Sequence, residues 1–374
     1  MKSITSSQKT ALPPRRIDFE LEAYMRSDNR IATWQITSTI VPIAIISAGI
    51  GKATQSLTGP TLILSAGLFV LLVLFLSRSF SLMHDCGHQS LFRSKKANRI
   101  AAFCLSLVHG MPHHPWSSGH AFHHKHNGNW DRYKGPSALI TCQEFKQKTA
   151  LSKRFYKLLR HPLLLFPGGF FYLIIKPRIA LLLGFFEFFF HLCQSMSQDV
   201  VAGRLPNLKI IAMDHRSKFF YTKEEAIDTT ANSLCVALIW WWAGSSIGHL
   251  HFWLVYALVM STSAALMIAV FFIQHNFPGS YTSNEEEWSY FKGALEGSSY
   301  LQLPTVLNWF TADIAYHHIH HLSERIPNYR LSQCHQANIH LLGGVHRLYL
   351  SEIPSCFSLI LWDRDNLRLT TTAA

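Results

Sequence analysis

Charged residues are scarce in this chain, and their scarcity limits the structural classes to which the protein can belong. They make up 15% of the 374 residues, while apolar residues make up 48%. Soluble domains carry about 25% charged residues, so an ordinary soluble globular protein is not the expected class. The composition instead favours an integral membrane protein.

The chain also lacks the marks of a secreted or nucleic-acid-binding protein. Its seven cysteines are odd in number and form no Cys-x-x-Cys pair, so we expect reduced cytoplasmic thiols. The first 30 residues contain no apolar run followed by a small-residue cleavage site, so we expect no cleavable signal peptide. The net charge is +12, but the basic residues form no compact patch interleaved with aromatic residues. We therefore expect no nucleic-acid partner.

Four apolar stretches have the length of membrane-spanning helices, which need about 20 residues to cross about 30 Å of hydrocarbon. They cover residues 34–51, 60–81, 231–248 and 252–274. Pro42 interrupts the first stretch. Because the linkers within each pair are short, we expect two antiparallel hairpins.

The distribution of lysine and arginine orients these hairpins. Of the 34 basic residues, 32 lie before residue 34, between residues 84 and 230, or after residue 274. In a four-span chain these segments share one side, which the positive-inside rule makes cytoplasmic. The same basic residues would also form a face toward anionic lipid headgroups, and this interpretation is compatible with the topology. We expect a protein of the bacterial inner membrane, with cytoplasmic segments 1–33 and 336–374 flanking a domain over residues 34–335.

Two weaker apolar stretches cover residues 163–175 and 179–193. They are interrupted by Pro167, Gly168, Gly169, Pro177 and Glu187. We interpret them as re-entrant or interfacial helices that lie partly in the membrane surface. If both crossed the membrane, six crossings would result and the orientation would not change.

Histidine is abundant, with 22 residues, and eight of them form three tight clusters. The clusters are His84 and His88; His120, His123 and His124; and His317, His320 and His321. Residues three and four apart share one face of a helix, so each cluster can direct two or three imidazoles toward one point. All three fall on the cytoplasmic side, and His275 follows the fourth stretch at the same depth. Unrelated surface or core histidines would require three coincidences of spacing.

Imidazole is a strong neutral ligand for iron, copper and zinc. Eight or nine imidazoles exceed the four ligands of structural zinc and the three of catalytic zinc, so the number indicates two metal ions with open positions. Iron is the metal used in this way for oxygen activation. Spacing alone leaves copper, manganese and zinc open. The remaining histidines near the clusters lack the required face, and we interpret them as outer or surface residues: His113, His114, His126 and His318.

The clusters resemble the three histidine boxes of the membrane-bound fatty acid desaturases of the acyl-lipid type. The matching segments are HDCGHQSLF at 84–92, GHAFHHKHNGNWD at 119–131, QHNF at 274–277 and AYHHIHHLSERIPNYRL at 315–331. The resemblance covers most of residues 60–335. These motifs together are specific.

The resemblance implies an all-α integral membrane protein, with four transmembrane helices in two hairpins and a cytoplasmic helical cap. The cap would hold two iron ions in a non-haem di-iron centre. The implied ligands are His84, His88, His120, His123, His124, His275, His317, His320 and His321. The implied reaction removes two vicinal hydrogens from a fatty acyl chain of a membrane lipid or an acyl thioester, and it consumes O2 and two electrons.

Three carboxylates are candidates for hydrogen bonds to these imidazoles. Asp313 stands where many acyl-lipid relatives have asparagine, although a helix cap or an ion pair would also explain it. Asp85 and Asp131 are weaker candidates. Some acyl-CoA relatives place an asparagine four residues before the final-span histidine, where this chain has Phe271.

The chain shows no haem-binding motif of a fused cytochrome b5, because His161-Pro is followed by Leu-Leu rather than Gly-Gly. We therefore expect electrons from a separate ferredoxin or cytochrome b5-like donor. A basic cytoplasmic face that includes Lys95 and Lys96 would suit docking of an acidic donor.

Other functions share part of this pattern. A hydroxylase, an acetylenase or a carotenoid oxygenase of the same superfamily would use the same histidines on a different substrate position. An intramembrane zinc protease needs the glutamate of His-Glu-x-x-His as a general base, and the first cluster offers only Asp85. A metal carrier would have metal-binding residues along its membrane spans, which here are almost free of them.

Overall fold

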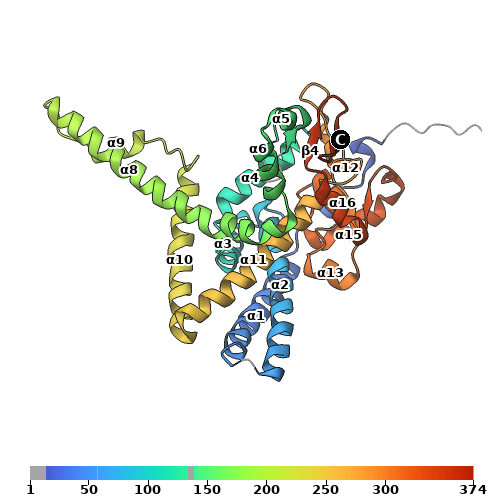
Figure 1. Ribbon diagram of the computed structural model, residues 1–374, viewed down its shortest axis with the longest axis horizontal. Helices are drawn as coiled ribbons and strands as arrows, with labels where there is room; N and C mark the ends of the chain where they lie inside the picture. The colour runs from blue at the N-terminus through green and yellow to red at the C-terminus, as the bar shows by residue number, and fades with distance from the viewer. Residues whose placement is uncertain (1–13, 57, 134–138, 374) are drawn as a thin grey trace, which may run out of the picture.

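The computed structural model describes residues 14–56, 58–133 and 139–373, and most of them are helical. Two long helical hairpins and a cap of short elements extend from a common centre (Figure 1). The first hairpin joins α1 (Asn29–Ala53) to α2 (Gly59–Gly87), and the second joins α10 (Lys223–Ile247) to α11 (His249–Ile273). Each helix is longer than the apolar stretch it contains.

The helices of the first hairpin differ from the sequence-based expectation at Pro42 and in the length of α2. The helix α1 begins where the Asp28 carboxylate accepts a hydrogen bond from the Arg30 N–H at 2.8 Å. The break expected at Pro42 is wrong, since α1 continues through it; packing against α2 outweighs the loss of one backbone hydrogen bond. The helix α2 extends to Gly87. His84 therefore lies beyond the predicted apolar stretch of residues 60–81, in the last turns of the same helix.

Among the described residues, three helices are candidates for crossing a membrane. By length and composition, α1, α2 and α11 are long and apolar enough to cross a membrane. The helix α10 is not among them. Even its uncharged residues 230–247 are less apolar than the other three helices, because they include polar residues such as Asn232 and Ser233. The chain is thus a membrane protein with three candidate spans, and the fourth expected span remains a prediction.

The segment of residues 162–201 is helical almost throughout. It comprises a 3-10 turn (Pro162–Leu164), α7 (Leu165–Phe170), a π-helical turn (Phe171–Ile175) and α8 (Lys176–Val201). The interruptions expected at Pro167, Gly168 and Gly169 are wrong. Pro177 has no N–H to donate to the preceding turn, and the π-helical turn just before it accommodates this loss. The helix α8 projects from the body together with α9 (Leu208–Asp214) (Figure 1).

The cap contains the remaining short elements. Its helices are α3 (Lys95–His109), α4 (His113–His126), α5 (Cys142–Gln147), α6 (Ala150–Leu159), α12 (Tyr290–Leu295), α13 (Thr305–Phe310), α14 (His317–Leu322), α15 (Asn328–Ala337) and α16 (Ile353–Ser358). Four 3-10 turns cover Arg16–Asp18, Glu22–Tyr24, Ile339–Leu341 and Leu350–Glu352.

The expected all-α fold needs a correction, because the described residues also form two small sheets. In one sheet, β1 (Ile140–Thr141) pairs in parallel with β4 (Leu361–Asp363), which pairs antiparallel with β5 (Arg368–Thr370). In the other, β2 (Tyr300–Leu301) pairs in parallel with β3 (Arg347–Leu348). Strands of two or three residues give too little periodicity to be seen in a sequence.

The C-terminal residues pack into the cap. A buried apolar cluster joins Ile273 and Phe277, which end the second hairpin, to Leu301, Leu348 and Cys356. The pairing of β2 with β3 holds the same segments together. The residues after 336 therefore support the end of α11, beside which His275 lies.

Candidate metal centre

Nine imidazoles meet in two adjacent groups where α2, α4, α14 and the end of α11 converge. The five-histidine group contains His84, His88, His120, His124 and His320. The four-histidine group contains His123, His275, His317 and His321. Within each group, one ring nitrogen of every residue lies within 4.8 Å of the others. The structure thus brings together all nine histidines that the sequence singled out.

The helices α4 and α14 each contribute to both groups. On α4, His120 and His124 belong to the five-histidine group, while His123 belongs to the other. On α14, His317 and His321 belong to the four-histidine group. In a helix, the side chains at positions i and i+4 point in nearly the same direction. The side chain at position i+3 is rotated about the helix axis to the other side of position i. Two of the three imidazoles in each of these clusters therefore share a group, in line with the expectation, and the third belongs to the other group.

The ring nitrogens of the four-histidine group face one another in an arrangement that suits a cation between them. The Nδ1 of His275 donates to the Gly297 carbonyl at 2.8 Å, so the neutral ring carries a lone pair on Nε2. That Nε2 lies 3.0 Å from Nε2 of His123 and 2.9 Å from Nε2 of His317. The single lone pair on that Nε2 cannot fully accept hydrogen bonds from both neighbours. The donor set fits a metal ion, which several imidazole lone pairs bind together.

The five-histidine group shows the same pattern. Nε2 of His120 lies 2.9 Å from Nε2 of both His84 and His124. Nε2 of His88 is buried and has no hydrogen-bond partner. A buried nitrogen without a partner is costly unless it binds something else. This group, too, has the chemistry of a metal site.

Burial keeps these rings in the form that binds metal. It lowers the pKa of His123, His124 and His321 well below the usual value, and neighbouring imidazoles lower it further. Burial likewise lowers the pKa of His275 to about 4. At neutral pH these four rings are therefore uncharged, which is the state in which imidazole coordinates a metal.

Two carboxylates approach the five-histidine group from outside. Asp85 lies 3.2 Å from Nδ1 of His84, and its other oxygen accepts hydrogen bonds from the backbone N–H and the side-chain amide of Asn328 at 2.7 and 2.9 Å. Glu324 lies 3.2 Å from Nδ1 of His88 and 3.9 Å from Nδ1 of His124. The hydrogen bond from His88 lowers the pKa of Glu324. A carboxylate on Nδ1 leaves Nε2 free for a metal.

Glu324 was missed by the reasoning from sequence. It follows the end of α14, where helical spacing no longer predicts which side a residue faces. Its position three residues after His321 was the available signal, because a carboxylate close to a ligand cluster often orients an imidazole.

The other two predicted carboxylates make their contacts elsewhere. Asp131 pairs with Arg364 at 3.1 Å and accepts a hydrogen bond from the Glu285 N–H at 3.2 Å. Burial raises the pKa of Asp313 to about 6, although the nearby Arg78 opposes this shift. The Asp313 carbonyl, not its carboxylate, accepts the N–H of Tyr316 just before α14. Within the described contacts, neither carboxylate bonds to one of the nine imidazoles.

Aromatic side chains cover one side of the two groups. Trp116 stacks on His120 with ring centres 4.9 Å apart. The Phe271 ring centre lies 5.6 Å from that of His84 and 5.8 Å from that of His317, so it contacts both groups. An apolar wall beside the metal-binding nitrogens suits a hydrocarbon substrate better than a polar one.

The neighbouring histidines have partners of their own. His113 pairs with Asp228 at 3.0 Å and so fixes the start of α4 on α10. His318 is buried, and its Nε2 lies 2.8 Å from Nδ1 of His335. Neither residue belongs to the two groups.

The approach of α12 to the end of α4 leaves no room for a side chain at Gly293. A Cβ there would lie 2.2 Å from the backbone oxygen of Asn127. We expect Gly293→Ala to cost roughly 1–3 kcal/mol of stability, because backbone must move to accommodate it. Thermal unfolding of the detergent-purified protein measures this loss. Gly168→Ala is the control, since nothing lies within 4 Å of a Cβ at that site. Equal melting temperatures for the two variants would contradict the packing argument.

Comparisons with known proteins agree with this geometry. The family model described as "Fatty acid desaturase" matches residues 61–352. A "Fatty acid desaturase" from Bacillus subtilis (strain 168) is 28% identical over 370 residues, which cover 99% of this chain and 94% of the relative.

Two Arabidopsis thaliana proteins are also similar. The "sn-2 acyl-lipid omega-3 desaturase (ferredoxin), chloroplastic" is 24% identical over 72% of this chain and 53% of its own length. The "Acyl-lipid omega-3 desaturase (cytochrome b5), endoplasmic reticulum" is 26% identical over 72% of this chain and 62% of its own length. The chain thus spans nearly the whole bacterial relative and a little more than half of these plant relatives.

Proposed function

The chain belongs to the fatty acid desaturase family and is an oxidoreductase of that class; on that premise we propose that it desaturates the acyl chains of membrane lipids with two iron ions bound by its nine clustered histidines. The observation that carries this proposal is the convergence of nine buried imidazoles into two groups. A site at the ends of the apolar helices α2 and α11 is suited to a substrate that lies in the membrane rather than to a water-soluble one. An acyl thioester is the alternative substrate form.

The proposed reaction converts adjacent CH2 groups of the acyl chain into a CH=CH pair. The substrate gives up two hydrogens, and O2 accepts them together with two electrons from a donor and two protons, forming two waters. Bound iron would supply the oxygen chemistry, which no protein side chain provides. The chain's own residues hold the ligand nitrogens neutral and oriented, and Phe271 and Trp116 keep water from one side of the site.

Three features support acyl lipid as the substrate. The candidate spans α1, α2 and α11 carry apolar residues that face outward, such as Leu62, Ile63 and Leu254. The aromatic wall of Phe271 and Trp116 lies where α2, α4 and α11 meet, so a lipid chain would reach it along the helices. The plant relatives are named acyl-lipid desaturases.

We also propose that α10 is the fourth span and that the metal centre faces the cytoplasm. The short connection at Gly248 forces α10 to run antiparallel to α11. Of the 34 basic residues, 32 fall in segments that this topology places on the side of the metal centre. The near-complete match to a relative from Bacillus subtilis supports a bacterial protein, and we propose the bacterial inner membrane as its location.

Expression in a desaturase-deficient bacterial host tests the function. Gas chromatography of the host's fatty acids should show a new double bond, and metal analysis of the purified protein should find about two irons per chain. Oxygenated acyl chains in place of a double bond would identify a hydroxylase instead. One zinc and no iron would overturn the proposal.

We expect Glu324→Ala to weaken metal binding in the five-histidine group by about 10–100-fold, because the imidazole of His88 loses the acceptor that orients it. Competition with a chromophoric chelator measures the affinity of each metal position separately. Glu286→Ala is the control, since this exposed glutamate lies outside both groups. Unchanged affinity in the Glu324 variant would show that its carboxylate only covers the site.

A further inference from the structure

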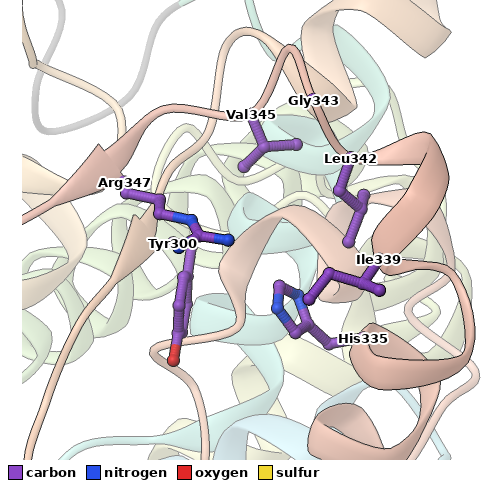
Figure 2. A pocket seen from close by; sticks show the side chains of 7 residues that line it. All are labelled: Tyr300, His335, Ile339, Leu342, Gly343, Val345 and Arg347. Carbon is purple, nitrogen blue, oxygen red and sulfur yellow. The ribbon is translucent and has the colours of Figure 1, made fainter.

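The cap contains a second cluster of chemically active side chains that the reaction does not yet use. It lines a pocket of about 260 Å³ formed by β2, β3, α15 and the turn that follows α15 (Figure 2). The lining residues are Tyr300, His335, Ile339, Leu342, Gly343, Val345 and Arg347. All nine histidines of the two groups are described, and none of them lines this pocket.

One wall of the pocket connects directly to α14. His335 is buried, and its Nδ1 lies 2.8 Å from Nε2 of the buried His318. One ring donates a proton to the other, so the two are joined by a hydrogen bond. His318 follows His317, a proposed metal ligand, by a single peptide bond. A pocket-lining ring is therefore two links from the four-histidine group.

Stacked rings provide a second connection to the same point. The ring centres of Tyr300 and His335 are 4.9 Å apart. Tyr300 also stacks on Tyr316 at 4.9 Å with an interplanar angle of 16°. Tyr316 immediately precedes His317. Tyr300, Tyr316, His318 and His335 thus form a four-ring cluster between the pocket and the start of α14.

The mouth of the pocket is cationic. Arg347 is exposed, and its guanidinium reaches over the pocket toward the ring of His335 (Figure 2). The pairing of β2 with β3 places Arg347 beside Tyr300. The opposite wall is apolar, with Ile339, Leu342 and Val345. A guanidinium beside an apolar wall suits a carboxylate presented by a protein surface.

We propose that this pocket is the docking point of an acidic one-electron carrier protein and that the four-ring cluster is the route by which its electron reaches the metal centre. The proposal rests on the proposed function, which requires two electrons from outside the chain. At each encounter the carrier is oxidised by one electron and the histidine-bound metal is reduced by one, with no bond made or broken. Two encounters supply the pair of electrons that one O2 consumes. Electron transfer from the pocket to the metal centre is faster through closely packed rings, a hydrogen bond and a peptide bond than through open space.

The names of the relatives identify suitable probes. Ferredoxin and cytochrome b5 appear in the names of two plant relatives, and both carriers transfer one electron at a time. The test uses the full-length, iron-loaded protein with reduced plant-type ferredoxin or reduced cytochrome b5 haem domain. The readouts are carrier affinity at low salt and the anaerobic rate of metal reduction in a stopped-flow spectrometer. A small chemical reductant with a viologen mediator gives the reference rate.

We expect Arg347→Glu to raise the carrier Kd by about tenfold or more, because it places a like charge at the contact. We expect His335→Phe and Tyr300→Leu to slow carrier-driven reduction by an order of magnitude at saturating carrier, while mediator-driven reduction and iron content stay normal. Two ring variants guard against the failure of one to fold. The charge control is Lys95→Glu on α3, which reverses one exposed positive charge as Arg347→Glu does; the double variant Lys95→Glu with Lys96→Glu adds a stronger reversal at the same place.

Three results would overturn the proposal. Carrier-driven rates that stay normal in both ring variants would remove the route. A carrier Kd that rises in the Lys95 and Lys96 variant but not in Arg347→Glu would move docking to the start of α3. A wild-type protein that even the mediator fails to reduce would overturn the proposed metal chemistry, and the route with it.

Discussion

His317→Ala is expected to abolish the new double bond while leaving the protein in the membrane. Nε2 of His317 lies 2.9 Å from Nε2 of His275 and 3.2 Å from Nε2 of His321. Alanine leaves three imidazoles in the four-histidine group, so the metal there loses a ligand that no neighbouring side chain replaces. Because both metal positions are needed, product should fall below detection rather than decline in proportion.

Three measurements on the same membranes separate loss of chemistry from loss of protein. Gas chromatography reports the double bond, an immunoblot of the membrane fraction reports the amount of protein, and metal analysis should show the iron content falling by about half. His126→Ala is the control, because His126 is a buried histidine of the same cap that belongs to neither group. Wild-type levels of unsaturated product in the His317 variant would rule out the ligand assignment.

The sequence predicted which histidines meet but not how they divide. Spacing of three and four residues is a local property of a helix, so α4 and α14 could be recognised as ligand-bearing before any fold was known. The division into five and four depends on where α2 and the end of α11 approach these helices. That approach is set by tertiary packing, which no local pattern reveals. One such contact joins Trp116 to Phe80, whose ring centres lie 5.1 Å apart.

Prolines were the main source of error in the helix boundaries. Pro42 and Pro167 were expected to interrupt helices and do not. Inside a packed helical bundle, neighbouring helices outweigh one missing hydrogen bond, whereas sequence rules describe isolated helices. The same limitation hides the pairing of β2 with β3, since Tyr300 and Arg347 lie far apart in the chain.

Asp85→Ala is expected to cause the largest loss of stability among these variants. Asp85 is buried, and its carboxylate meets His84 Nδ1 and both the backbone and side-chain N–H groups of Asn328. Removing it leaves these buried donors without an acceptor, at a cost of about 1–3 kcal/mol each. Such costs are not additive, and removing one partner of a buried charged pair typically costs roughly 3–5 kcal/mol in total. Thermal unfolding in detergent should therefore show a clear fall in melting temperature.

A second variant separates the two roles of Asp85. Asn328→Ala removes the side-chain bond from α15 to Asp85 but keeps the backbone N–H bond and leaves the carboxylate beside His84, so it should lower stability less than Asp85→Ala does and keep the iron. Asp85→Ala should lower stability and also weaken metal binding by about 10–100-fold, because His84 loses the group that fixes its tautomer. If both variants keep their iron equally well, Asp85 serves to join α2 to α15 and does not orient His84. If only the Asp85 variant loses iron, one carboxylate links the position of α15 to the ligand geometry of the five-histidine group.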